Sequence, residues 1–129
     1  MKRPDAVLLS GPPAAGKTTL AAALAPHLGA ALLDIDVATG PLTCVISELV
    51  GATDLGDPRL AKLTRTARYE TLLALAADNL RAGTSVIIVA PFTPERELGP
   101  WNIGAERLRP YAHELLLLGL SRPLRDLRG

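Results

Sequence analysis

The most constraining feature of this sequence is the segment Gly11–Thr18, which has the pattern G-x-x-x-x-G-K-T. It follows a short apolar run, Ala6–Ser10, and leads into the alanine-rich segment Thr19–Leu28. A strand, a glycine-bounded loop and a helix in this order are the typical context of a phosphate-binding loop. A turn whose glycines serve only the chain reversal is the alternative, and chance rarely produces the whole pattern with the correct flanks. The segment therefore predicts a site for nucleotide phosphates.

The residue types in this loop explain its expected chemistry. Gly11 and Gly16 let the backbone approach an anion closely, because neither carries a Cβ atom. The loop amides and the start of the next helix would point N–H groups at phosphate oxygens, and the helix dipole adds a favourable field. Lys17 supplies a positive charge for the β- and γ-phosphates, and the Thr18 hydroxyl suits Mg²⁺. The predicted phosphate-binding residues are Gly11, Pro12, Pro13, Ala14, Ala15, Gly16, Lys17, Thr18 and Thr19.

Segments that are apolar throughout alternate with helical patterns along the chain. Strands without polar alternation are typical of parallel sheets that are covered on both faces. The sequence therefore predicts one α/β domain over residues 1–129, a three-layer sandwich around a mostly parallel sheet of four strands. The expected strands are Ala6–Ser10, Ala31–Asp36, Thr84–Ala90 and Glu114–Leu120. The expected helices are Lys17–Leu28, Leu42–Val50 after a break at Gly40 and Pro41, Arg59–Arg81 and Trp101–Arg109.

The composition argues against several other classes of protein. A net charge of +1 without blocks of like charge, and an aromatic content of 3%, argue against a nucleic-acid partner. No stretch is apolar over the roughly eighteen residues that a membrane span requires, and the N-terminus does not have the pattern of a signal peptide. Cys44 is the single cysteine, which excludes an internal disulfide, and we expect it to be a small buried hydrophobe. We therefore expect a cytoplasmic protein.

Two aspartates near the end of the second expected strand are candidates for chemistry. Asp34 and Asp36 are two residues apart, so on a strand they would share one face. Ligands of open α/β sheets bind beyond the carboxyl ends of the strands, where these residues would lie. Beside a magnesium nucleotide, one carboxylate could hold a metal-bound water and the other could accept the proton of an attacking hydroxyl. An acidic strand end that caps a helix is the alternative.

Basic side chains on the third expected helix are a second set of candidates. Arg65 and Arg68 lie one turn apart with Lys62 near the same face, and they could hold an anionic acceptor or the transferred phosphoryl group. A solvent-exposed basic face is equally compatible with this pattern. Phe92 and Thr93 follow the third expected strand, so we expect them to form walls of an acceptor pocket.

Three segments together resemble one group of enzymes: Gly11–Thr18, Leu33–Asp36 and Val89–Phe92. Over about residues 5–120 the chain is similar to the small P-loop kinases, nearest to an AAA-domain-labelled, kinase-like family. That family resembles shikimate kinase, gluconate kinase, chloramphenicol phosphotransferase and zeta toxin. The resemblance implies a P-loop NTPase fold with strand order 2-3-1-4, a mobile lid, ATP and Mg²⁺ as cofactors, and a small-molecule hydroxyl as the acceptor.

The resemblance also implies roles for individual residues. Asp34 would support the metal together with Thr18, and Lys17 would act on the phosphates. Asp36 would be the base or an acceptor ligand, and Arg68 would contact the acceptor. The residues that would hold phosphates and Mg²⁺ are Gly16, Lys17, Thr18 and Thr19.

The chain departs from this family near its end, where the resemblance implies a lid with arginines, a fifth strand and an adenine-binding loop. Arg122, Arg125 and Arg128 could be the remnant of a lid. A missing lid and base pocket would weaken catalysis and nucleotide selectivity, and would expose the edge of the first or fourth strand to a homodimer partner. Three functions stay open: a small-molecule kinase, a non-catalytic nucleotide- or phosphate-binding relative, and a toxin-like kinase that acts on a nucleotide sugar.

Overall fold

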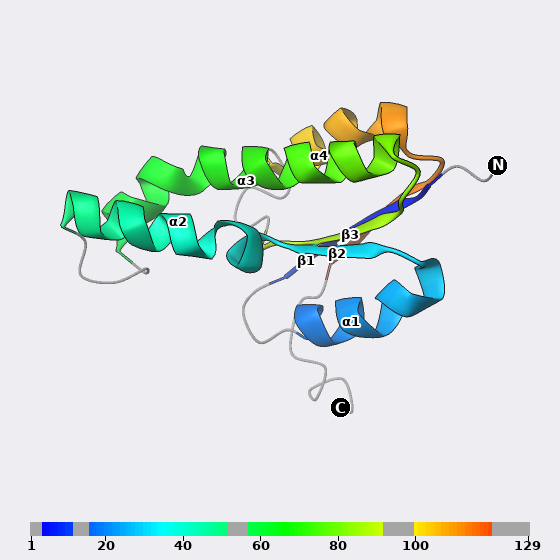
Figure 1. Ribbon diagram of the computed structural model, residues 1–129, viewed down its shortest axis with the longest axis horizontal. Coiled ribbons are helices and arrows are strands. Elements are labelled where there is room, and N and C mark those ends of the chain that lie inside the picture. Colours follow the sequence, from blue (N-terminus) through cyan, green and yellow to red (C-terminus); the bar gives the residue numbers. More distant parts are fainter. Residues whose placement is uncertain (1–3, 12–15, 52–56, 92–99, 120–129) are drawn as a thin grey trace.

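Parallel strands form the sheet at the centre of the computed structural model, which describes residues 4–11, 16–51, 57–91 and 100–119 (Figure 1). Within these residues the sheet has four strands in the order β2-β3-β1-β4, and each neighbouring pair is parallel. The expected fold class and strand order are therefore confirmed. The strands are β1 (Ala6–Ser10), β2 (Ala31–Asp34), β3 (Val86–Val89) and β4 (Leu115–Gly119).

Helices cover both faces of the sheet, which confirms the three-layer arrangement. Figure 1 shows α1 on one face and α3 with α4 on the other, while α2 runs beside α3 in an arm that extends beyond the strands. No helix in the described parts of the chain is both long enough and apolar enough to span a membrane. The helices are α1 (Lys17–Leu28), α2 (Ile35–Val50), α3 (Pro58–Arg81) and α4 (Pro100–Leu108).

The buried core has two parts, because alternate residues of the central strands point to opposite faces of the sheet. On one face, Leu8 and Ile88 pack with Leu72 of α3. On the other face, Leu9 packs with Ala21 of α1. Aliphatic side chains dominate both parts, as the low aromatic content predicts. The two clusters fix the start of α1 and the ends of β1 and β3 relative to one another.

Helix α2 corrects one expectation from the sequence. It begins at Ile35, and Gly40 and Pro41 lie inside it instead of breaking the chain before a shorter helix. A proline inside a helix lacks one N–H donor and costs roughly 3 kcal/mol. The packing of α2 along α3 offsets this cost, because a continuous face that includes Thr39 and Thr43 is buried there.

Within the described residues the edge strands are β2 and β4, so of the two strands expected to have an exposed edge, the first does not have one and the fourth does. β1 lies between β3 and β4 and pairs with both of them. β4 is an edge among the described residues, and it is only partly buried: Leu116 is 52% exposed. The expected fourth strand is therefore present, but it is not a fully buried one.

Cys44 is exposed, which contradicts its expected role as a small buried hydrophobe. The side of α2 that packs on α3 is occupied by hydroxyl-bearing residues, among them Thr43 and Ser47. Cys44 follows Thr43 directly, and a helix turns by about 100° per residue, so its side chain falls outside the buried face. The rotation of α2 about its own axis thus decides the exposure of the thiol.

Candidate functional site

A cavity of about 370 Å³ lies where α1 begins, β2 passes into α2 and β3 ends. Parallel α/β folds bind their ligands at this carboxyl edge of the sheet. The predicted phosphate-binding residues Pro12, Pro13, Ala14 and Ala15 lie outside the described residues. The lining residues are Gly16, Lys17, Thr18, Thr19, Asp34, Ile35, Asp36, Val89, Ala90 and Pro91.

The start of α1 forms one wall of this cavity. Gly16 precedes the helix with φ +92°, a backbone conformation that residues with a Cβ atom rarely adopt. Its carbonyl accepts the Leu20 N–H at 3.0 Å, which closes the first turn. The amides of the first turn of a helix have no intrahelical acceptor, and they favour an anion at this end. Lys17, Thr18 and Thr19, which the sequence predicts as phosphate-binding residues, belong to that turn and line the cavity.

Lys17 brings the positive charge to the same wall. Its Nζ donates a hydrogen bond to the Gly11 carbonyl at the end of β1, so the side chain folds back over the loop. Partial burial lowers the pKa of Lys17 below the usual 10.5, while the nearby carboxylates of Asp36 and Asp34 act in the opposite direction. Both aspartates are thus electrostatically coupled to the loop lysine. One positive and two negative side chains meet in the cavity.

Asp34 caps helix α2 instead of sharing a strand face with Asp36. Its Oδ1 accepts the backbone N–H of Asp36 at 2.8 Å and that of Val37 at 3.4 Å. A carboxylate in this position satisfies two amides that have no partner inside the helix. The expectation that both aspartates lie on the second strand is therefore wrong: β2 ends at Asp34, and Asp36 belongs to the first turn of α2. Both nevertheless line the cavity.

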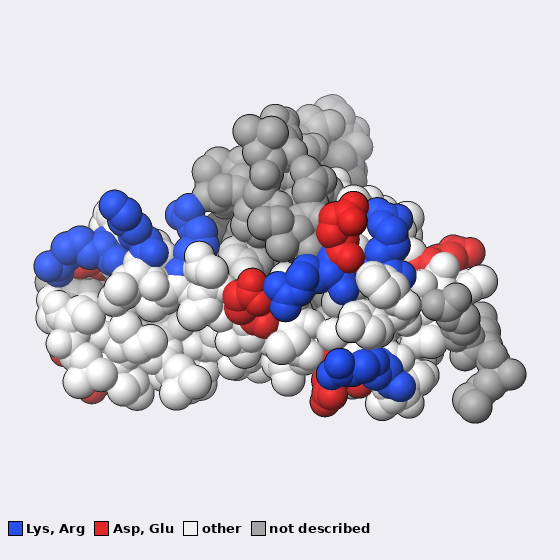
Figure 2. All heavy atoms as spheres, turned by 90° about the horizontal axis from the view of Figure 1, so that it is seen from above, with Lys and Arg blue, Asp and Glu red and all other residues white. Residues whose placement is uncertain are grey.

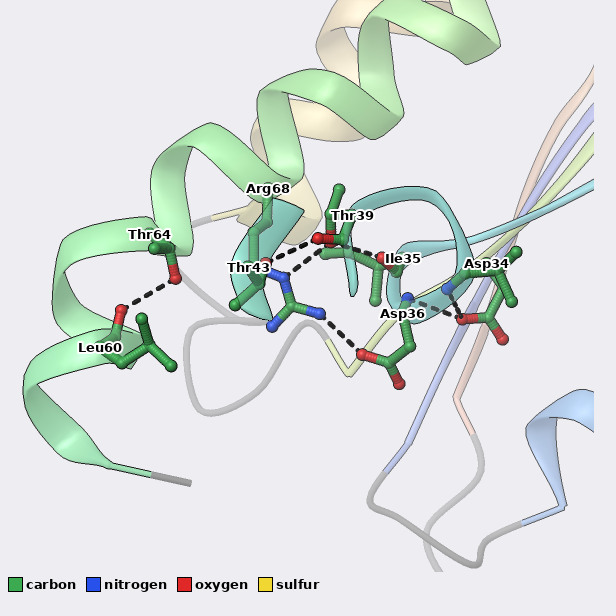
Figure 3. A network of polar contacts seen from close by, with 9 residues as sticks. Asp34, Ile35, Asp36, Thr39, Thr43, Leu60, Thr64 and Arg68 are labelled. Atoms are coloured by element: carbon green, nitrogen blue, oxygen red, sulfur yellow. Dashed lines mark hydrogen bonds and ion pairs between the residues drawn. The ribbon is translucent and has the colours of Figure 1, made fainter. Parts of the chain in front are cut away.

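Asp36 forms an ion pair with Arg68, which comes from the middle of α3 (Figure 3). The distance between Arg68 Nη2 and Asp36 Oδ1 is 2.7 Å. The Nε–H of the same guanidinium donates to Thr39 Oγ1 at 2.8 Å, and the Thr39 hydroxyl donates to the Ile35 carbonyl at 2.6 Å. Arg68 is thereby held in one orientation beside a carboxylate that is 83% exposed.

Thr39 is a site residue that the sequence analysis did not identify. The sequence contains a pattern that could have identified it: Asp36 and Thr39 are three residues apart, so they lie on one side of a helix that includes both. The expected break at Gly40 and Pro41 concealed it. The structure thus brings Asp36 and Arg68 together, as candidate residues of one site, and adds the threonine that positions the arginine.

The contribution of the Thr39 contact can be measured with a matched pair of variants. Thr39→Val should lower the free energy of unfolding by about 1 kcal/mol more than Thr43→Val, because only Thr39 accepts a hydrogen bond from a charged group. Thr43 is an apt control, since it is equally buried in α2 and donates the same type of bond, to the Thr39 carbonyl. Urea denaturation of both variants measures the difference. Equal losses would show that the Arg68 contact adds nothing.

Other candidates from the sequence lie apart from these contacts or outside the described residues. Lys62 and Arg65 have exposed side chains on α3 and do not line the cavity. Phe92 and Thr93, the expected walls of an acceptor pocket, are outside the described residues. The same holds for the arginines expected as the remnant of a lid: Arg122, Arg125 and Arg128.

The donor set in the cavity fits a magnesium nucleotide. Mg²⁺ prefers oxygen ligands and usually combines one or two protein ligands with phosphate oxygens and waters. The Thr18 hydroxyl and the Asp34 carboxylate are oxygens of this kind, and both residues line the cavity. Among the described residues, no group of three or more His, Cys, Asp or Glu side chains could enclose a metal ion. The site therefore suits a metal that is held jointly with phosphates.

The comparison with known families agrees with this geometry. A family model described as an AAA domain matches residues 7–118, which is most of the chain. The chain belongs to this family. This match, together with the similar proteins and solved structures described in the next two paragraphs, confirms the expected P-loop, kinase-like domain.

Similar sequences include two kinds of protein. The cytidylate kinase of Herpetosiphon aurantiacus is 40% identical over 79 residues, which cover 60% of this chain and 34% of that protein. The Holliday junction branch migration complex subunit RuvB of Mycolicibacterium gilvum is 36% identical over 107 residues, covering 70% of this chain and 29% of that protein. The chain thus spans about a third of the length of these relatives. Their names differ in what the proteins act on, so neither assigns a substrate to this P-loop domain.

Solved structures of kinases share the fold of this P-loop domain. A protein of Chloroflexus aurantiacus assigned as a kinase has a TM-score of 0.65 and 23% identity, over 93% of this chain and 60% of that one. An unliganded sugar kinase of Janibacter sp. also has a TM-score of 0.65, with 22% identity over 98% of this chain and 65% of that one. At these identities the similarity shows the fold alone.

Proposed function

We propose that this P-loop domain transfers the γ-phosphoryl group of ATP, bound with Mg²⁺, to a hydroxyl group of a small molecule. The observation that carries the proposal is the cavity itself, whose lining combines the first turn of α1, Lys17 included, with Asp34 and Asp36. Phosphoryl transfer needs an anion cradle, a positive charge and a carboxylate that can receive a proton. The residues that would supply these three groups line one cavity.

The phosphate end of the proposed site is the turn from Gly16 into α1. Its amides and the Lys17 ammonium would bind the phosphate oxygens, and Lys17 would exchange its present acceptor, the Gly11 carbonyl, for them. Thr18 and Asp34 would hold Mg²⁺, which supplies charge neutralisation on the phosphates when it is bound. Because Oδ1 of Asp34 accepts the two amides that begin α2, Oδ2 would be the oxygen that binds such a ligand.

The acceptor end of the proposed site is the pair formed by Asp36 and Arg68. Asp36 would accept the hydrogen bond of the acceptor hydroxyl and then its proton. Arg68 would fix the Asp36 carboxylate in place and offer its remaining N–H groups to an oxygen of the acceptor. The ion pair thus serves orientation, and it leaves the second carboxylate oxygen of Asp36 for the acceptor.

A non-catalytic nucleotide- or phosphate-binding role is the second candidate. It is favoured by the cavity volume of about 370 Å³, which is near the lower end for a small-molecule site. In this role the phosphate loop would bind a nucleotide or phosphate, and no phosphoryl group would be transferred. A toxin-like kinase acting on a nucleotide sugar is a special case of the first proposal.

Calorimetric titration with ATP, GTP and pyrophosphate, each with Mg²⁺, tests the proposal first. We expect micromolar binding of ATP that is tighter than binding of GTP or pyrophosphate, because a kinase must hold the nucleoside as well as the phosphates. ADP formation from ATP should then rise when a panel of sugars, nucleosides and amino alcohols is added. Equal and weak binding of all three ligands, with no ADP formed, would favour the phosphate-binding role instead.

A further inference from the structure

Helix α2 presents an apolar stripe to solvent. Val37 and Leu49, at its two ends, are 78% and 79% exposed, and Leu42 is 70% exposed. Figure 2 shows a broad uncharged area at the end of the molecule where the arm of α2 and α3 extends, with the charged side chains gathered beside it. The apolar stripe consists of Val37, Pro41, Leu42, Val45 and Leu49.

The polarity of α2 is the reverse of that expected for a helix on the surface of a monomer. Such a helix buries its apolar face and exposes its polar one. In α2, hydroxyl-bearing residues are buried on the α3 side, where Thr39, Thr43 and Ser47 are between 5% and 8% exposed. The threonine hydroxyls are satisfied within the helix, by the Ile35 and Thr39 carbonyls. Apolar contact surface therefore remains on the outer side, where none of the described residues covers it.

The size of the apolar stripe matches one half of a small specific interface. Its side chains expose roughly 500 Å², which is near the upper limit of the patches that a typical monomer leaves uncovered. Two such stripes in contact would bury roughly 1,000 Å² of apolar surface, the size at which specific protein interfaces begin. A second copy of the chain can supply such a surface without any further partner.

We propose that two copies of this chain associate through antiparallel contact of their α2 helices. The spacing of the stripe supports this choice, because residues 37, 41, 45 and 49 are four apart and symmetric about Thr43. We place the two-fold axis on the outer side of α2, at the level of Thr43 along the helix. In this antiparallel pair, Val37 lies opposite Leu49 of the second copy and Pro41 lies opposite Val45. Each of these four residues thus meets an apolar side chain of the second copy.

The charges on this side of α2 do not oppose the pairing. Glu48 is the charged residue beside the stripe, and it is five residues from the two-fold axis. The two Glu48 side chains would therefore be about 15 Å apart along the helices, which is more than the screening length at physiological salt. The inference concerns an association surface and does not depend on the proposed phosphoryl transfer.

Cys44 makes the pairing directly testable with the unaltered chain. It is exposed and one residue from the two-fold axis, so the two thiols would lie on the same rim of the contact, about 3 Å apart along the helices. With helix axes about 8–10 Å apart, a short bismaleimide should convert the 13.6 kDa chain into a covalent dimer in high yield. A Cys44→Ser chain with Asp78→Cys, which moves the thiol to an exposed position on α3, should cross-link far less.

Analytical ultracentrifugation over a concentration series gives the second readout. Leu49→Glu should raise the dissociation constant of the dimer by about tenfold or more, because it places a charge in the apolar contact. Leu116→Glu is the matched control: it adds the same charge at a half-exposed leucine on the edge strand β4 and should leave the dimer unchanged. Circular dichroism melting of each variant confirms that it is folded.

The outcomes of cross-linking and sedimentation distinguish association through the α2 stripe from association through the sheet edge. A chain that sediments as a monomer at every concentration and gives no cross-link overturns the proposal, and this result does not depend on how any variant folds. A dimer that is lost with Leu116→Glu and kept with Leu49→Glu also overturns it, in favour of pairing through the sheet edge. A dimer that is lost with Leu49→Glu alone supports the α2 contact.

Discussion

Replacement of Lys17 by alanine should raise the dissociation constant for magnesium ATP by about ten- to a hundredfold, because a charge-assisted hydrogen bond is worth about 1.5–3 kcal/mol and a tenfold change corresponds to about 1.4 kcal/mol. Lys17 is the positive side chain on the cavity wall formed by the start of α1. The helix amides remain in the variant, so weak binding of phosphates should persist. Calorimetric titration with ATP measures the change.

A second lysine provides the control for this variant. Lys62 is exposed on α3 and does not line the cavity, so Lys62→Ala removes the same charge from the chain without touching the site. Its ATP affinity should stay close to that of the unaltered chain. Thermal unfolding of Lys17→Ala should be measured as well, since Lys17 also donates to the Gly11 carbonyl. A folded Lys17→Ala chain that still binds ATP tightly would contradict the phosphate-loop assignment.

Replacement of Asp36 by asparagine should lower the rate of phosphoryl transfer by about 10²–10⁴-fold while ATP binding changes little. The amide keeps the shape of the side chain and can still accept from Arg68, but it cannot take the proton of the acceptor hydroxyl. General-base catalysis typically contributes a factor of this size. The measurement is ADP formation from ATP with the acceptors that the panel identifies.

The matched control is Asp78→Asn, which neutralises an exposed aspartate that is paired with Arg81 on α3, away from the cavity. It should leave both binding and transfer unchanged. Asp34→Asn provides the internal comparison, because Asp34 also lines the cavity and caps α2. Loss of transfer in Asp34→Asn is expected from its proposed metal-binding role, whereas full transfer activity in Asp36→Asn would overturn the role proposed for Asp36.

Local sequence patterns were sufficient to predict helix and strand boundaries that depend on loop glycines, helix caps and prolines. The end of β1, the glycine before α1 and the first turn of that helix follow from the spacing in Gly11–Thr18. The start of α3 follows from Asp57, whose carboxylate accepts the Arg59 N–H at 2.8 Å, and from Pro58 in the first turn. Residues within one turn of each other determine such features, so the linear sequence contains them.

The same patterns failed at α2, where a local rule and a tertiary contact conflict. Gly40 and Pro41 normally end a helix, yet α2 continues through them because one of its sides packs along α3. The expected break at Gly40 and Pro41 led to the assignment of Asp36 to the strand instead of the helix, and Thr39 was not identified as a site residue. The exposure of Cys44 was missed for a different reason: it depends on which side of α2 packs against α3.

The sequence by itself determined that this chain has the pattern of a phosphate-binding loop within a parallel α/β fold, and which acidic and basic side chains could serve the site. Only the tertiary structure decided that Asp36 pairs with Arg68 through atoms 2.7 Å apart, although the two residues are 32 positions apart in the chain. The physical reason is the difference in range between the two kinds of interaction. Loop and cap geometry depends on neighbouring residues, whereas the partner of a side chain depends on how two helices pack against each other.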